Sequence, residues 1–293
     1  MIIAVLAGLG GMLGWGLADF FAKKTIDVIG DVTTLIWAHV IGTAIILAAL
    51  GFEVANGEQG NLPSEWRSWI GLIGFGGLQA AVYLFMYRGF GKGQVAVLAP
   101  LFASFAGLVA LFSVLLFREP VTLALVVALL LVFTGVMALN LDLGELRQRR
   151  LGILKVPGFT EIATATLLAT LWTLGWDQFV SGRDWLAFAA AMYVFMTISL
   201  LAYAGFHRLS LGFAEPGAWK FLTMIGICEV GAYIAVSWGY EATLHTSIVA
   251  LVSGACALPT IFLAKIFLKE QTTRLQTIGG VLIVTGIVLL GIW

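Results

Sequence analysis

Charged side chains are scarce in this chain of 293 residues: Asp, Glu, Lys and Arg make up 11% of it, against 60% hydrophobic residues. A soluble globular domain usually carries about 25% charged residues. The composition therefore excludes an ordinary water-soluble fold and indicates lipid as the solvent. The net charge is +0, and it gives no reason to expect a surface that binds nucleic acid.

Cysteine and histidine are also rare, with two and three residues. The sequence has no Cys/His cluster, HExxH motif, P-loop or nucleophile elbow, which disfavours a membrane-embedded enzyme and gives no basis for a metal or a cofactor. Cys228 and Cys256 both lie in apolar runs, where a free buried thiol is expected rather than a disulfide. Met1 opens directly into an apolar run without a basic start, so we expect a retained first helix and no signal peptide.

Long hydrophobic runs dominate what is present. A segment of about 20 apolar residues is long enough to cross a bilayer, and lipid forces such a segment to be helical. The sequence predicts an all-α integral membrane protein with ten transmembrane helices. The expected spans are residues 2–21, 32–51, 67–87, 93–117, 121–141, 158–180, 184–206, 217–240, 245–267 and 273–292.

The ten expected spans divide into two sets of five at a long polar connection, LDLGELRQRRLGILKVPG. We predict a first five-helix repeat over 1–141, a cytoplasmic linker over 142–157 and a second repeat over 158–293. One charged corner occurs in both halves, 151 residues apart, as LFREPVT and FLKEQTT. We interpret its glutamates, Glu119 and Glu270, as residues at the start of the next helix, where a carboxylate favours the positive helix end.

A second match supports the repeat. A shift of 150 residues places QAAVYLFMYRGF over EVGAYIAVSWGY, so that Gln79 meets Glu229 and Tyr83 meets Tyr233. Because each half has an odd number of spans, the second half enters the membrane from the opposite face. The sequence therefore predicts inverted repeats, an architecture typical of transporters.

The basic residues predict the orientation. Thirteen of them fall at the odd-numbered connections and three, Arg67, Arg118 and Arg183, at the even ones. By the positive-inside rule the odd connections face the cytoplasm, so both termini face outward. We expect a multi-pass protein of a plasma membrane, such as a prokaryotic inner membrane.

The end of the chain, EQTTRLQTIGGVLIVTG, resembles the end of an EamA-type protein of the drug/metabolite transporter superfamily. The first repeat keeps Glu119, Thr122 and Gly135 but has Leu125 and Ala128 where the pattern has Gln and Gly. The resemblance implies ten helices and transport of small organic solutes. The residues on the recurring pattern E-x-x-T-x-x-Q-x-x-G-x-x-L-I-x-x-G are Glu270, Thr273, Gln276, Gly279, Leu282, Ile283 and Gly286.

Glu229 is the main candidate for the substrate site. It falls near the middle of the eighth span, with its repeat mate Gln79 near the middle of the third. An ionisable group at that depth is costly and usually faces a cavity or a partner, and transporters of this architecture bind substrate near the midplane. We expect the two side chains to face each other across the pseudo-twofold axis. The alternative is a hydrogen bond that only holds helices together.

Aromatic residues surround this position in the sequence. If they line a pocket, they suit a solute with an apolar or aromatic body and a cationic or amino group for Glu229. The alternative is that they pack between helices or lie at the headgroup level. The candidates are Trp15, Tyr83, Trp172, Trp176, Tyr233 and Trp238.

Glu229, where a proton and a cationic substrate group could compete, and three further residues are candidates for coupling or gating. Asp19 and Asp177 each lie near the end of the first helix of a repeat, although Asp19 could simply pair with Lys23 one turn later. His39 could titrate near neutral pH, or it could be a satisfied residue near a span end. Pro100 and Pro259 each remove a backbone donor inside a span and can kink it, and such a kink could serve as a gate or be static.

These features favour a secondary transporter. We predict an exporter of small amphipathic metabolites, such as amino acids or related amines, that works by alternating access, with proton coupling left open. Its partners are a small-molecule substrate and the bilayer, and it is a monomer or a homodimer. The alternative is a channel or sensor-type helix bundle, and a membrane-embedded enzyme is less favoured.

Overall fold

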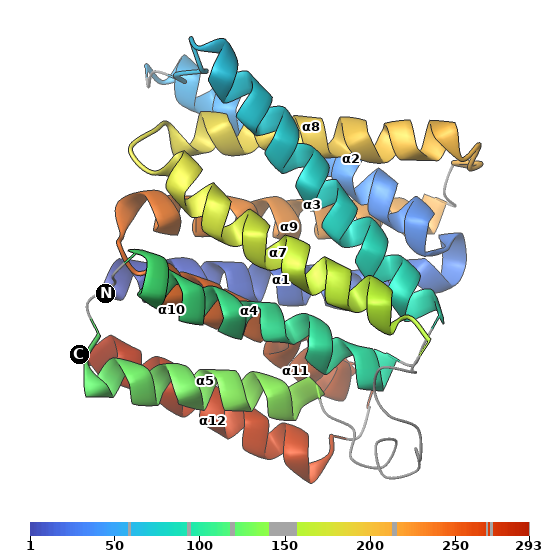
Figure 1. Cartoon of the computed structure of the whole chain (residues 1–293). Coiled ribbons are helices and arrows are strands. Elements are labelled where there is room, and N and C mark those ends of the chain that lie inside the picture. Colours follow the sequence, from blue (N-terminus) through green and yellow to red (C-terminus); the bar gives the residue numbers. More distant parts are fainter. Residues whose placement is uncertain are drawn as a thin grey trace.

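A computed structural model of the chain describes residues 1–57, 60–92, 95–117, 121–140, 157–212, 216–267, 269 and 272–292. Within them the regular structure is entirely helical, and the helices lie side by side in one bundle (Figure 1). The helices are α1 (Ile2–Ile29), α2 (Asp31–Ala55), α3 (Trp66–Lys92), α4 (Val95–Phe117), α5 (Leu123–Asn140), α7 (Phe159–Val180), α8 (Trp185–Phe206), α9 (Pro216–Ala242), α10 (Thr246–Ser253), η2 (Gly254–Cys256), α11 (Ala257–Phe267) and α12 (Arg274–Ile292).

Most of the helices, α7 and α4 excepted, have the length and composition of membrane spans. Among the described residues, eight segments are long and apolar enough to cross a bilayer, with α10 to α11 counted as one. The apolar part of α4, Leu101–Phe117, is shorter than the others. The prediction of an all-α integral membrane fold is confirmed.

The two halves pack against each other in matching pairs. Helix α1 packs on α9 just as α3 packs on α7, and α2 packs on α9 as α3 packs on α8. When each helix is replaced by its counterpart in the other half, the α1–α9 contact becomes the α7–α3 contact, and the α2–α9 contact becomes the α8–α3 contact. Helix α5 packs on its own counterpart α12. A twofold relation between the halves explains this pattern.

The contact between α5 and α12 shows the twofold relation at the level of residues. A Cβ on Gly135 would meet the Gly279 carbonyl oxygen at 2.7 Å, and a Cβ on Gly286 would meet the Ala128 carbonyl oxygen at 2.9 Å. Gly286 is the counterpart of Gly135, and Ala128 is the counterpart of Gly279, so the second contact is the symmetry mate of the first. Small residues let the two helix backbones approach this closely.

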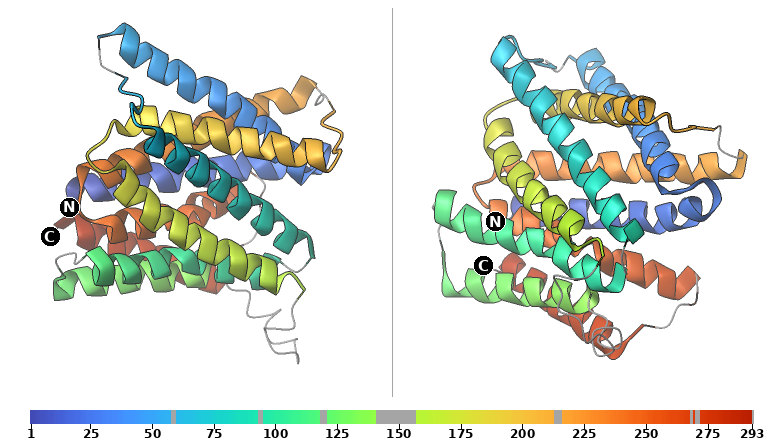
Figure 2. Two further views of the ribbon diagram at one scale, coloured as in Figure 1. Left: turned by 45° about the horizontal axis from the view of Figure 1, so that its top comes forward. Right: turned by 45° about the vertical axis from the view of Figure 1, so that its right-hand side comes forward.

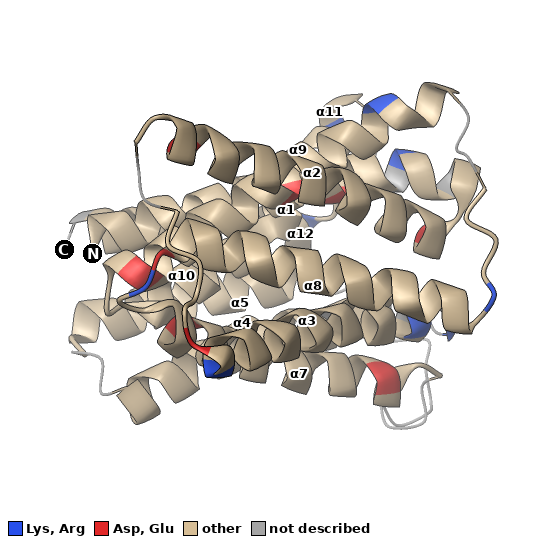
Figure 3. Cartoon of the chain, turned by 90° about the horizontal axis from the view of Figure 1, so that it is seen from above, with Lys and Arg blue, Asp and Glu red and all other residues tan. Residues whose placement is uncertain are grey.

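Counterpart helices run in opposite directions. In Figure 1, α5 begins at the end of the bundle where both termini lie, and α12 finishes there. Figure 2 shows the N- and C-terminal ends close together from two further sides. Lys and Arg are concentrated at the opposite end of the described bundle (Figure 3).

The second repeat contains the kink that its proline predicts. Ala255 has non-helical backbone angles (φ −79°, ψ 17°) and separates α10 from α11. Pro259 has no N–H to donate to the carbonyl four residues earlier, which is that of Ala255. The kink expected at Pro259 is thus confirmed, whereas α4 continues as one helix through position 100.

The repeated charged corner ends in a helix cap. The Leu125 N–H donates to Thr122 Oγ1 (3.1 Å) at the start of α5. At the start of α12, the Gln276 N–H donates to Thr273 Oγ1 (3.2 Å) while the Thr273 N–H donates to Gln276 Oε1 (2.9 Å). This reciprocal pair is a capping box. Glu119 and Glu270, to which we assigned the helix start, lie outside the described residues.

Candidate functional site

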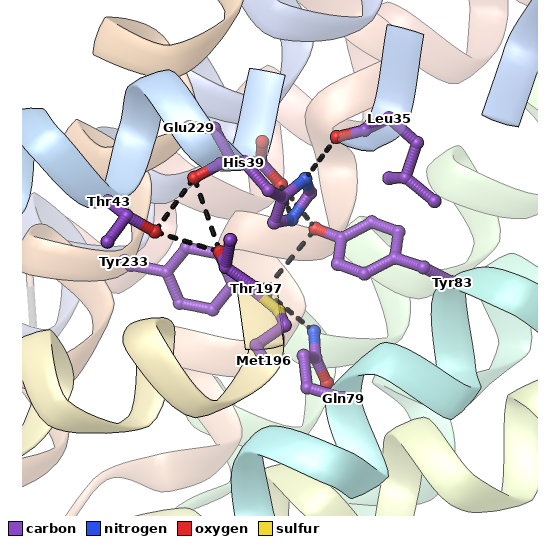
Figure 4. Close-up of polar contacts among 9 residues, drawn as sticks. All are labelled: Leu35, His39, Thr43, Gln79, Tyr83, Met196, Thr197, Glu229 and Tyr233. Carbon is purple, nitrogen blue, oxygen red and sulfur yellow. Dashed lines mark hydrogen bonds and ion pairs between the residues drawn. The ribbon is translucent and has the colours of Figure 1, made fainter. Parts of the chain in front are cut away.

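Glu229 and Gln79 lie in the interior of the bundle, on α9 and α3, and are joined crosswise through two tyrosines (Figure 4). Gln79 Nε2 donates to the Tyr233 hydroxyl at 2.8 Å. The Tyr83 hydroxyl donates to Glu229 Oε1 at 2.7 Å, and the two tyrosine hydroxyls are 3.3 Å apart.

This arrangement corrects one detail of the sequence prediction. Gln79 and Glu229 were expected to face each other, but each instead binds the tyrosine of the other half. The reason is helical spacing: within α3 and within α9 the polar residue and the tyrosine are one turn apart. Opposed helices that run in opposite directions therefore place Gln79 beside Tyr233 and Glu229 beside Tyr83.

His39 on α2 joins the same cluster. Its Nε2 lies 3.3 Å from Glu229 Oε1, and its Nδ1 is 2.8 Å from the Leu35 carbonyl oxygen. The imidazole is 1% exposed, so it is an interior residue and not the satisfied residue near a span end that was the alternative. Its ring meets the Tyr83 ring edge-on, with centroids 5.2 Å apart.

Tyr193 on α8 belongs to the site and was not among the residues expected from the sequence. Its ring stacks on His39, with centroids 5.4 Å apart and planes 16° apart. It also meets the Tyr233 ring edge-on, and it interacts electrostatically with Glu229. Gly42 makes room for it, because a Cβ there would lie 2.5 Å from the Tyr193 hydroxyl oxygen.

Four tryptophans were expected to line the pocket. Trp15 on α1 and Trp172 on α7 both meet the Tyr233 ring edge-on, at 5.7 and 6.1 Å between centroids. Trp176 stacks on Trp172 and donates to Ser237 Oγ. Trp238 packs half-buried against the hydrophobic core. The structure thus brings Trp15 and Trp172 to the tyrosine pair, with Trp176 behind them.

The two aspartates differ in their surroundings. Asp19 is exposed, yet it interacts electrostatically with Glu229 inside the bundle. Asp177 is 4% exposed and accepts a hydrogen bond from Gln178. Because α1 and α7 run in opposite directions (Figure 1), the two carboxylates lie toward opposite ends of the bundle.

Gln79 Oε1, an acceptor, and Trp15 Nε1, a donor, are buried atoms of the site without a hydrogen-bond partner among the described residues. His39 Nε2 and the Tyr193 hydroxyl oxygen share that property, but both residues interact electrostatically with Glu229. Such atoms are costly in an interior unless a ligand or water forms hydrogen bonds with them.

Within the same residues, no group of three or more His, Cys, Asp or Glu side chains could hold a metal ion.

Comparison with known proteins supports a membrane transport fold. A model of the EamA-like transporter family matches residues 2–141 and 157–292. No curated protein matches the sequence. One solved crystal structure superposes with a TM-score of 0.76, covering 98% of this chain and 97% of its own chain at 18% identity. At that identity the likeness shows a shared fold.

Proposed function

Because the chain belongs to the EamA-like transporter family, we propose that it is a secondary transporter that exports small amphipathic amines or amino acids across a plasma membrane by alternating access. The family is one of transporters and not of enzymes, so Glu229 and its neighbours bind a solute and do not transform it. One observation carries the proposal: a carboxylate of the second half, Glu229, lies in the interior of the helix bundle and is held by Tyr83 and His39 of the first half.

The proposed topology has ten spans in two inverted repeats of five, residues 1–141 and 158–293, joined by a linker at 142–157. The matching helix pairs and the opposite directions of α5 and α12 support it. Termini at one end of the bundle agree with an even number of crossings (Figure 1). The concentration of basic residues at the other end supports an orientation with both termini outside.

The chemistry of the site favours an amine with an apolar body. Glu229 supplies a negative charge, and Gln79 Oε1 is an acceptor without a partner among the described residues. The rings of Trp15 and Trp172 meet the ring of Tyr233, to which Gln79 donates, edge-on. Aromatic faces and a carboxylate together attract an organic cation more strongly than either does alone.

The contrast between the two aspartates supports alternating access. Asp19 is exposed and Asp177 is buried, although they occupy similar places in the first helices of the two repeats. In a twofold fold, such a difference between the two ends implies a second state in which the ends exchange roles. The Asp19 side of the bundle lies toward the proposed cytoplasmic face.

The test has two steps. Metabolites released by expressing and non-expressing cells are compared, and the solute found is followed in proteoliposomes. Glu229→Gln keeps the size and hydrogen-bonding capacity of the side chain but removes its charge. We expect this variant to insert normally and to lose transport driven by a pH gradient. We expect Gln79→Ala to weaken substrate affinity while transport still responds to the gradient.

The matched control is Glu241→Gln, the same substitution near the end of the same helix, which we expect to transport as the parent does. Glu119→Gln should cost yield or stability only. If Glu229→Gln transports like the parent at every pH tested while inserted Glu119→Gln is inactive, the site lies at the charged corner and not at Glu229. Solute flux without saturation or counterflow would indicate a channel.

A further inference from the structure

We propose that His39 and Glu229 form an imidazolium–carboxylate pair that holds one proton, and that this proton leaves when an organic monocation binds Glu229. The inference rests on the proposed function and makes it more specific. It identifies His39 as the residue that carries the transported proton, and it limits the substrate to one positive charge.

The hydrogen bonds of His39 fix where its protons lie. The Leu35 carbonyl oxygen accepts only, so Nδ1, at 2.8 Å from it, carries a hydrogen. Nε2 then faces Glu229 Oε1 at 3.3 Å. A bare Nε2 lone pair against a carboxylate oxygen would be repulsive. One more proton is therefore required between the two groups.

That proton belongs to the imidazole. Glu229 Oε1 already accepts from the Tyr83 hydroxyl at 2.7 Å, and an oxygen that faces two donors has the character of an ionised carboxylate. With the proton on Nε2, the pair is neutral as a whole. A neutral pair is what an interior position inside the membrane tolerates, because a single uncompensated charge there is costly.

Among the described residues, the groups around Glu229 include no other cation to balance it. The titratable groups that face the pair are Asp19 from α1, Tyr83 and Tyr87 from α3, Tyr193 from α8 and Tyr233 from α9. None of these carries a positive charge in either protonation state. The imidazolium is thus the one positive group among the described residues that face Glu229, and removing its proton leaves a place for the charge of a substrate.

The exchange balances in atoms and charge. An ammonium group enters and pairs with Glu229, the Nε2–H bond of His39 breaks, and the proton passes to water on the exposed side where Asp19 lies. One positive charge enters and one leaves. Return of the proton to Nε2 in the other conformation releases the amine, so the cycle exchanges one proton for one monocation.

Nuclear magnetic resonance can observe the protonation state of His39 directly. The chain has three histidines, His39, His207 and His245, so ¹⁵N-histidine labelling in nanodiscs gives few signals, and His39→Gln identifies those of His39. At pH 7 we expect both ring nitrogens of His39 to be protonated in the parent. In Glu229→Gln we expect a neutral ring with hydrogen on Nδ1 alone, and in Glu241→Gln we expect the parent spectrum.

A neutral His39 in the parent, or a charged His39 in Glu229→Gln, overturns the pair. This result does not depend on transport, so it is distinct from a failure of the proposed function.

The exchange is tested with phenethylamine in weakly buffered solution, where we expect about one proton released per chain that binds, and none from His39→Gln. Binding without proton release overturns the exchange. Absence of binding overturns the proposed amine class.

Discussion

Glu229 shows how a charge is retained in the interior of a membrane protein. The Tyr83 hydroxyl on α3 donates a hydrogen bond to the carboxylate, and the imidazole of His39 on α2, which we propose to be protonated, lies beside it; both approach the same oxygen, Oε1. Hydrogen bonds to charged groups contribute about 1.5–3 kcal/mol each, which offsets part of the cost of removing the carboxylate from water. Each partner lies on a different helix, so the site exists only when the bundle is assembled.

Gly42 is a position where one methyl group should disturb the site. A Cβ there would lie 2.5 Å from the Tyr193 hydroxyl oxygen and 3.0 Å from two ring carbons. In Gly42→Ala, Tyr193 must therefore move away from its stacked position on His39. We expect a loss of about 1–3 kcal/mol of stability, as in other overpacked interiors. Thermal unfolding in detergent and transport in proteoliposomes measure the two effects.

Further variants distinguish a clash with the Tyr193 hydroxyl from the effect that any Gly→Ala substitution has on α2. In Gly42→Ala/Tyr193→Phe the hydroxyl oxygen is gone but the ring remains, so we expect partial recovery of stability. Gly51→Ala on the same helix places a methyl in open space and should unfold like the parent. If the double variant is no more stable than Gly42→Ala, the hydroxyl contact is not what limits this position.

The sequence identified most residues of the site but missed Tyr193, for a reason that lies in the repeat. Gln79, Glu229, Tyr83 and Tyr233 match at a spacing of 150 residues, whereas Tyr193 lies 154 residues from its neighbour His39. Thr43 and Thr197 have that same spacing of 154, and their hydroxyls are 2.8 Å apart. In each of these two pairs, a residue of the first half contacts the residue in the corresponding place of the second half. A comparison of the two halves at a fixed shift of 150 or 151 residues does not reveal such a pair.

At the scale of helices, α12 depends on its capping box. Thr273→Ala removes the hydroxyl that accepts from the Gln276 N–H, and we expect a cost of about 0.5–2 kcal/mol, as for other N-cap threonines. The measurement is the free energy or midpoint of unfolding in detergent. Thr285→Ala is the control, because Thr285 is exposed and bonds only the Val281 carbonyl of its own helix. Equal stability of the two variants would contradict the cap.

The prolines show what the sequence predicts about helices and what it leaves to packing. The break before α11 follows from Pro259, whose missing N–H leaves the Ala255 carbonyl without its usual donor. Neighbours also support the break: Thr260 Oγ1 donates to the Cys256 and Gly16 carbonyl oxygens. Pro100 has the same covalent effect on α4, yet α4 remains one helix. We attribute the difference between the broken helix at Pro259 and the continuous helix at Pro100 to contacts with neighbouring helices, which the sequence alone does not show.

The whole molecule combines a twofold architecture with an asymmetric state. Hydropathy and the repeat predicted the helical class and the two halves, because lipid leaves few alternatives for an apolar chain. The difference between exposed Asp19 and buried Asp177 was not predictable. Two halves of similar sequence adopt different surroundings only through the conformation that the whole bundle takes, and no local pattern encodes that choice.

The orientation of the whole molecule gives the last prediction. Ser64, in the connection between α2 and α3, and Ser210, in the connection between α8 and α9, are both exposed, and serine is nearly the size of cysteine. The two connections lie at opposite ends of the bundle (Figure 1). The excess of basic residues at the end of Ser210 predicts that this end faces the cytoplasm. In intact cells, an impermeant maleimide should therefore label Ser64→Cys at once and Ser210→Cys only after permeabilisation. The parent, whose Cys228 and Cys256 are half-buried, gives the background. Labelling of Ser210→Cys alone in intact cells would reverse the orientation and place Asp19 on the outer side, and it would leave the twofold packing of the helices unchanged.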